Sequence, residues 1–139
     1  PNDLLIDGCK CAGILIEGEG DIAVVGIGVN CTHHPSGTDF PATDLAAAGL
    51  RASPEKVFEA LTGAMARRLA QWDRGAGFAA VRADWLKRAA SLGQDIKVAV
   101  TEGTRSGRFE TVDDRGNLVL RLPNGATETI AAGYVLLGH

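Results

Sequence analysis

The chain has 139 residues, of which 45% are hydrophobic and 22% are charged, and its formal net charge is −3. This length fits one domain or a domain with a small appendage, and the composition is typical of a globular protein. No basic cluster suits a nucleic-acid surface, and no apolar run approaches the ~20 residues of a membrane span. We therefore expect neither DNA nor a membrane as a partner.

The chain begins with Pro1 and enters an apolar run at residues 4–6. Because it lacks an initial methionine, we expect it to be a piece of a longer protein. We expect no secretory signal, and the cysteines are odd in number: Cys9, Cys11 and Cys31. Reduced thiols and a cytoplasmic location are therefore expected.

Three strands are predicted in the first part of the chain, at residues 4–6, 12–17 and 22–30. Asp7 and Gly8 predict a tight turn, and residues 18–21 predict a hairpin connection. Residues 22–30 are nearly all apolar, which is typical of a strand covered on both faces. Residues 31–52 are predicted to be mostly loop, with a short helical piece near residues 43–48.

Two alanine-rich helices are predicted next. Ser53 and Pro54 favour a helix start, with serine as N-cap and proline in the first turn. Residues at helical spacing predict its buried stripe: Val57, Leu61, Met65, Leu69 and Trp72. A second helix is expected from Phe78 to Leu92, ended by Gly93. Both tryptophans, Trp72 and Trp85, are expected in core packing.

Five short strands are predicted after the helices, near residues 96–101, 105–112, 117–121, 126–131 and 134–137. Their lengths and turns favour a small closed barrel. The composition changes at Leu92–Gly93, so two domains are expected, residues 1–92 and 93–139. The predicted fold class is α+β: a mixed or antiparallel sheet packed with helices, followed by a small all-β barrel.

Three features of the first thirty residues could carry chemistry. Asp3 lies at a strand entrance, where its carboxylate could accept a proton or hold a metal-bound phosphate. The alternative is that Asp3 is only a turn residue. Lys10 could neutralise a carboxylate or phosphate, or be a solvated surface lysine. On a strand Gly26, Gly28 and Asn30 share one face, so a flat ligand could lie on bare backbone there. The alternative is close packing of a helix on these glycines.

Together these features resemble the biotin protein ligase family. In that family a Lys-Trp-Pro-Asn-Asp stretch precedes a Lys-x-x-Gly-Ile-Leu-x-Glu strand and a Gly-x-Gly-x-Asn strand. This chain has Pro1-Asn2-Asp3, Lys-Cys-Ala-Gly-Ile-Leu-Ile-Glu at residues 10–17 and Gly-Ile-Gly-Val-Asn at residues 26–30. The resemblance implies that residues 1–92 are the carboxy-terminal half of the catalytic domain. It implies a Src-homology-3-like barrel for residues 93–139.

The resemblance also implies an activity. Family members activate biotin with ATP, with magnesium present, to biotinyl-adenylate and pass biotin to a lysine of a carboxylase carrier domain. Lys10 would contact the biotin carboxylate and the adenylate phosphate, and Asp3 would act near the reacting centre, through magnesium or the acceptor lysine. Further residues would line the biotin pocket or border the adenylate: Gly13, Ile14, Leu15, Gly26, Gly28 and Asn30.

The chain departs from the family pattern in what precedes Pro1. The lysine and tryptophan of the first motif are missing, as is the Gly-Arg-Gly-Arg-x-Gly-Arg loop of the amino-terminal half. The chain alone is therefore expected to be inactive, and its uncovered apolar faces are expected to favour association, a homodimer included. Two alternatives stay open: a non-catalytic binding module or half of a split protein, and a lipoate–protein ligase relative.

Overall fold

The computed structural model describes residues 2–136, without the side chain of Tyr134, so Pro1 and Leu137 of the predictions lie outside it. The chain divides into two compact units that meet inside a helix, between Ala64 and Met65. Each unit is described by itself. The structure has two helices and two antiparallel sheets, which confirms the predicted α+β class. The domain boundary at residues 92/93 stays a prediction.

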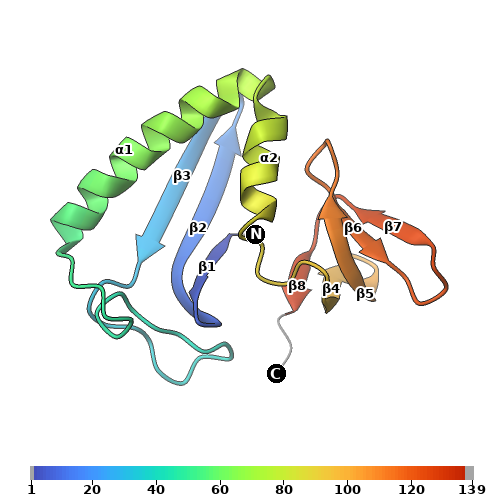
Figure 1. The fold of residues 1–139 in the computed structure, drawn as a ribbon, viewed down its shortest axis with the longest axis horizontal. Helices are drawn as coiled ribbons and strands as arrows, with labels where there is room; N and C mark the ends of the chain where they lie inside the picture. Colours follow the sequence, from blue (N-terminus) through green and yellow to red (C-terminus); the bar gives the residue numbers. More distant parts are fainter. Residues whose placement is uncertain (1, 137–139) are drawn as a thin grey trace. The chain divides into compact units, whose positions relative to one another are not determined.

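The first unit contains a three-stranded antiparallel sheet in the order β1-β2-β3 (Figure 1). Its strands are β1 (Asp3–Ile6), β2 (Cys9–Glu19) and β3 (Ile22–Val29). Asp7 and Gly8 have φ values of 50° and 78°, and they form the predicted tight turn between β1 and β2. All three strands predicted for this region are confirmed, although β2 begins three residues earlier than expected.

The prediction that the strand at residues 22–30 is covered on both faces is wrong for the residues the structure describes. Ile22 and Val24 of β3 are 68% and 59% exposed. An apolar sequence pattern reports how hydrophobic a strand is, but burial needs a second layer over each face. The first unit is a single sheet with little to cover it, and its apolar side chains stay open.

Helix α1 (Pro54–Trp72) begins where predicted, since the Ser53 Oγ accepts the N–H of Lys56 at 3.4 Å. The predicted buried stripe is only partly confirmed. Three of its members are half-buried: Val57, Leu61 and Met65. Leu69 and Trp72 are exposed, and no residue of α1 is fully buried, so core packing is a wrong prediction for Trp72.

A 3₁₀ turn, η1 (Asp73–Gly75), leads into α2 (Phe78–Leu86), which is shorter than predicted. The residues after Leu86 turn towards the second sheet. Gly93 donates its N–H to the Phe109 carbonyl, and Phe109 donates in return to Gln94, both at 2.8 Å. These sheet-type bonds join the segment after α2 to β5 of the second sheet.

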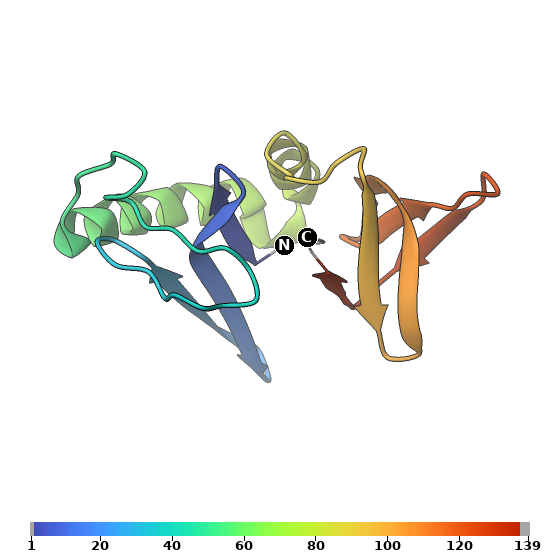
Figure 2. The same ribbon diagram turned by 90° about the horizontal axis from the view of Figure 1, so that it is seen from below.

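The second sheet is antiparallel, in the order β7-β6-β5-β4-β8. Its strands confirm the five predicted ones: β4 (Asp95–Val100), β5 (Gly103–Val112), β6 (Leu118–Arg121), β7 (Thr127–Ile130) and β8 (Tyr134–Leu136). The hairpin of β4 and β5 is the longest part of this sheet, coloured gold to orange in Figure 2. Closure into a Src-homology-3-like barrel stays a prediction.

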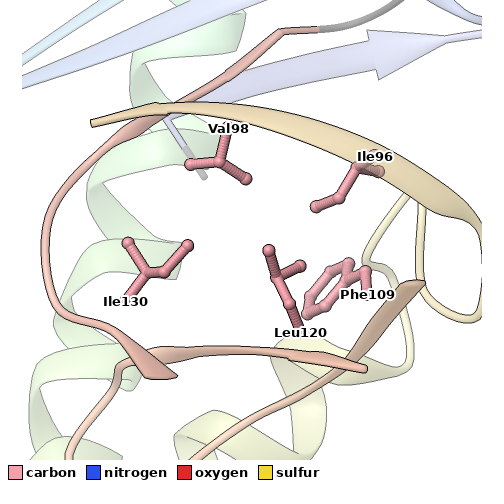
Figure 3. Packing of buried hydrophobic residues seen from close by; sticks show 5 residues of the cluster. All are labelled: Ile96, Val98, Phe109, Leu120 and Ile130. Carbon is pink, nitrogen blue, oxygen red and sulfur yellow. The ribbon is translucent and has the colours of Figure 1, made fainter. Parts of the chain in front are cut away.

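A cluster of buried hydrophobic side chains lies within this second sheet. Five side chains from four strands point towards one another (Figure 3): Ile96, Val98, Phe109, Leu120 and Ile130. Trp85 of α2 lies against Phe109 with ring centroids 6.3 Å apart, in a tilted arrangement typical of aromatic pairs. The prediction that Trp85 packs in the core is thus only partly right, because 37% of this residue's surface remains exposed.

Candidate functional site

The two predicted charged site residues form an ion pair on the sheet of the first unit. The Lys10 Nζ lies 2.7 Å from the Asp3 Oδ1, and the two side chains are 43% and 42% exposed. Asp3 is the first residue of β1, and Lys10 is the second residue of β2. An exposed pair of this kind contributes little to stability, but its charges are accessible to a ligand.

An extra residue in β2 brings the Lys10 side chain to this position. Leu4 pairs with Ala12, whereas the next residue, Leu5, pairs with Lys10, so Cys11 is an additional residue on β2. Such a bulge disturbs the regular alternation of side chains. A Cβ added to Gly13 would lie 3.5 Å from the Lys10 Cε and 3.7 Å from the Asp3 Oδ1. The ion pair therefore extends across Gly13.

The glycines of β3 leave the neighbouring part of this sheet face bare. Gly28 is the direct partner of Gly13, and Gly26 is the partner of Leu15. A Cβ added to Gly28 would have no atom within 4 Å. The alternative interpretation of these glycines was close packing of a helix. At Gly28 no helix among the described residues packs that closely. The backbone here is open and lies next to the ion pair.

The structure separates the residues predicted to line a pocket. Gly13 and Leu15 share the face of the ion pair, because residues two apart on a strand point the same way. Ile14 lies between them and points to the opposite face, where its partner on β3 is Ile27. The bare face therefore joins Asp3, Lys10, Gly13, Leu15, Gly26 and Gly28, and it excludes the Ile14 side chain.

Asn30 ties the end of β3 to the following loop. Its Nδ2 donates to the Thr43 carbonyl at 2.9 Å, and its own carbonyl accepts the N–H of Leu45 at 2.9 Å. The Asn30 N–H donates to the carbonyl of Cys11 at 2.9 Å. The predicted ligand residue at the edge of the bare face thus also fastens the loop to the sheet.

Asp44 was not among the predicted site residues, yet it is the one buried charged side chain among the described residues, at 4% exposure. Its Oδ1 accepts the N–H of Ala47 at 2.7 Å, and its Oδ2 lies 2.7 Å from the Nδ1 of His34. These hydrogen bonds, the backbone one first, hold the pKa of Asp44 below its ordinary value. The signal in the sequence is an aspartate directly before a short helical turn, a typical capping position.

The cysteines near the site are free thiols. Cys11 is buried, and burial raises its pKa, helped by the nearby charges of Asp44 and of Cys31. A raised pKa keeps Cys11 protonated and a poor nucleophile at neutral pH. Cys11 is also the extra residue in β2.

Among residues 2–136, no group of three or more His, Cys, Asp or Glu side chains is arranged to hold a metal ion. Asp3 is a single carboxylate that already neutralises the ammonium of Lys10. Magnesium usually keeps several waters and binds through one or two carboxylates together with substrate phosphates. The described residues by themselves therefore do not form a resident magnesium site.

Residues 91–138 match the family model described as the biotin protein ligase C terminal domain. The chain is 39% identical to a biotin–[acetyl-CoA-carboxylase] ligase of Paracoccus denitrificans over 99% of this chain and 61% of the relative. It is 34% identical to the ligase of that name from Mycobacterium tuberculosis, over 98% of this chain and 51% of the relative. The chain thus spans about half to three fifths of the length of these curated relatives.

The fold is similar to that of a solved biotin protein ligase from Aquifex aeolicus in complex with biotin and ATP. The TM-score is 0.82 at 22% identity, covering 98% of this chain and 59% of the other. At this identity the likeness concerns the fold alone. Neither helix that the structure describes is long and apolar enough to cross a membrane.

Proposed function

Since this chain belongs to the biotin protein ligase family, as its carboxy-terminal part, we propose that it forms part of an enzyme that attaches biotin to a carrier lysine of acetyl-CoA carboxylase. The names of the Paracoccus and Mycobacterium relatives support this acceptor. The observation that carries the proposal is the Lys10–Asp3 pair at 2.7 Å beside the open backbone of Gly28. A charged group next to a bare, flat surface suits an anionic ligand with a planar body.

The proposed reaction has two steps. In the first, a carboxylate oxygen of biotin bonds to the α-phosphorus of ATP, and the bond to pyrophosphate breaks. The product of the first step is biotinyl-adenylate, a mixed anhydride. In the second step, the amine of the carrier lysine attacks its carbonyl carbon, AMP leaves, and the amine gives up a proton. Magnesium would enter with ATP. The complex of the Aquifex ligase with biotin and ATP supports these two substrates.

Lys10 serves the first step in this proposal. Biotin and ATP are both anionic, so they repel each other as they approach, and negative charge grows on the leaving pyrophosphate. A fixed ammonium beside the junction offsets both effects, and groups of this kind stabilise transition states strongly. Asp3 lies 2.7 Å from the ammonium and would hold it in position, and in this proposal its carboxylate would accept the proton of the carrier amine.

The bare sheet face serves substrate binding in this proposal. Gly13 and Leu15 would contact biotin, with Ile14 contributing through its backbone, since its side chain is on the other face. Gly26 and Gly28 would lie under the adenylate, and Asn30 would border it. The three free cysteines support a reducing, cytoplasmic setting for the reaction.

The experiment is biotin transfer from biotin, ATP and magnesium to an acetyl-CoA carboxylase carrier domain. The chain alone is compared with a chimera in which it replaces the matching part of the Paracoccus denitrificans ligase. We expect transfer by the chimera, little by the chain alone, and loss of transfer in a chimera with Lys10→Ala. A folded chimera that transfers lipoate instead, or that binds the carrier without transfer, would favour the lipoate or binding-module alternative.

A further inference from the structure

The β2 strand changes its neighbour at the residue that bears the proposed charge. Regular pairing with β3 ends at Ala12 and Val29, so β3 no longer flanks Lys10. A returning loop segment takes its place in parallel orientation, with Ala42 as the partner of Lys10. The Lys10 N–H donates to the Pro41 carbonyl at 2.8 Å, and the Thr43 N–H donates to the Lys10 carbonyl at 2.9 Å.

This segment, residues 41–43, is therefore the support on one side of Lys10. On its other side Lys10 pairs with Leu5 of β1, next to the bulge. Without the segment, the Lys10 backbone would have an unpaired N–H and C=O beside the irregular part of the sheet. Strand ends without a partner open readily. The direction of the Lys10 side chain therefore depends on how firmly residues 41–43 are held.

Two polar side chains hold the segment in place. Asn30 donates to the Thr43 carbonyl at 2.9 Å, so Thr43 is bonded to Lys10 through its N–H and to Asn30 through its C=O. Asp44, the next residue, is buried and joins His34 at 2.7 Å. The His34 ring comes from the loop after β3, so the pair closes this loop at its base. Removing one partner leaves the other without its hydrogen bond.

We propose that Asp44 and His34 are positioning residues that act on Lys10 through residues 41–43, which fixes the direction of the ammonium over Gly13. The inference rests on the proposed function, because it assumes that Lys10 contacts the reacting groups. Neither side chain needs to touch substrate. A small displacement of a catalytic group away from the chemistry lowers turnover strongly, by up to about 100-fold per ångström.

The test measures kinetics in the chimeric ligase and amide hydrogen exchange in both the chain and the chimera. We expect Asp44→Ala to lower kcat for biotin transfer about 10- to 100-fold, with a change in KM for biotin of less than about threefold. His34→Ala acts in the same direction, and the double variant loses no more than the stronger single one. Asp44→Asn keeps an acceptor for Ala47 and recovers most of the activity. Asp39→Asn, an exposed aspartate of the same loop, is the matched control.

Amide exchange separates positioning from general stability. In Asp44→Ala the amides of Lys10 and Thr43 should exchange faster, while the Phe109 amide of the second unit stays as protected as before. Faster exchange throughout the chain, or a loss of kcat without any change at Lys10 and Thr43, overturns the inference. If Lys10→Ala abolishes transfer and Asp44→Ala does not affect it, the inference fails and the proposed function stands. If Lys10→Ala has no effect, both fail.

Discussion

The Lys10 ammonium lies 2.7 Å from the Asp3 carboxylate, and both reach across the Cα of Gly13. The ion pair joins the second residue of β2 to the first residue of β1, next to a bulge. Bulges often lie beside active sites, where they re-aim a side chain. Here the bulge places a cation over Gly13, the direct partner of Gly28 on the neighbouring strand.

We predict that Lys10→Ala lowers biotin transfer by the chimeric ligase about 100-fold or more, because the ammonium offsets charge at the carboxylate–phosphate junction. Steady-state transfer of labelled biotin measures the effect. Lys97→Ala is the matched control, since Lys97 is exposed on β4 and forms no ion pair within residues 2–136. Equal activities of the two variants would contradict the role of Lys10.

We predict that Gly28→Val weakens ATP binding at least about tenfold, or roughly 1.4 kcal/mol, without loss of fold, because Gly28 would lie under the adenylate. Nothing lies within 4 Å of a Cβ at this position, so a valine would fit the sheet and occupy the ligand's space. Titration calorimetry of the chimera with ATP measures binding, and circular dichroism follows folding. Gly18→Val, near the far end of β2, where a Cβ would have only the Ile22 carbonyl oxygen in contact at 3.9 Å, should leave affinity unchanged. Unaltered affinity of Gly28→Val would exclude the bare face as the ligand surface.

The core of the second sheet depends on Leu120, whose side chain is completely buried. Leu120→Ala removes buried carbons and leaves a cavity, so we expect the free energy of unfolding to fall by about 2–5 kcal/mol. Urea denaturation of the chain measures the loss. Val119→Ala, at the half-buried neighbouring position, should cost clearly less. A similar cost for both would mean that Leu120 does not occupy the centre of the core.

The hydrogen bonds of Asp113 are expected to make the stability of the fold sensitive to acid. Its Oδ1 accepts the N–H groups of Arg115 and Asn117, and its Oδ2 accepts the Asn117 Nδ2. These bonds, that of the Asn117 side chain first, lower the pKa of Asp113 from its ordinary 3.8. A carboxylate whose pKa is lower in the folded than in the unfolded chain stabilises the fold fully at pH values above its unfolded-state pKa. This stabilisation is lost as the pH falls through its folded-state pKa.

We therefore expect the chain to melt at a higher temperature than Asp113→Asn at pH 6, and the gap to close as the pH drops below about 4. Thermal melts between pH 3 and pH 7 measure it. Asp114→Asn is the control, because the neighbouring Asp114 is exposed and has no side-chain hydrogen bond among the described residues. A gap that widens in acid would refute the assignment.

Because the sheet of the first unit is uncovered, we predict that copies of this chain associate with one another. Ile22 and Val24 expose most of their surface, and contiguous apolar patches favour association. Replacing both with threonine keeps β propensity and removes apolar area, so we expect the sedimentation coefficient of the chain at high concentration to fall towards that of a monomer. If the unmodified chain is already a monomer at high concentration, the prediction fails.

The sequence alone determined the local elements and the candidate residues. Alternating apolar residues and glycine-containing turns predicted the three strands of the first sheet and the five of the second, because side-chain period and turn chemistry are local properties. The resemblance of residues 10–17 and 26–30 to biotin ligase motifs identified Lys10 and Gly28. The helix of residues 54–72 could likewise be predicted from its cap and spacing.

Only the tertiary structure decided how these residues meet. Strict alternation would direct Lys10 and Gly13 to opposite faces, and it is the extra residue Cys11 that brings them together. The pairing of Lys10 with Ala42 joins segments more than thirty residues apart, and the burial of Asp44 in the same loop is likewise not specified by local sequence. The predictions also overestimated how far α1 and β3 are buried, because local spacing does not show which segments cover them. Register and burial depend on which distant segments pair and cover one another, which residue spacing along the chain does not specify.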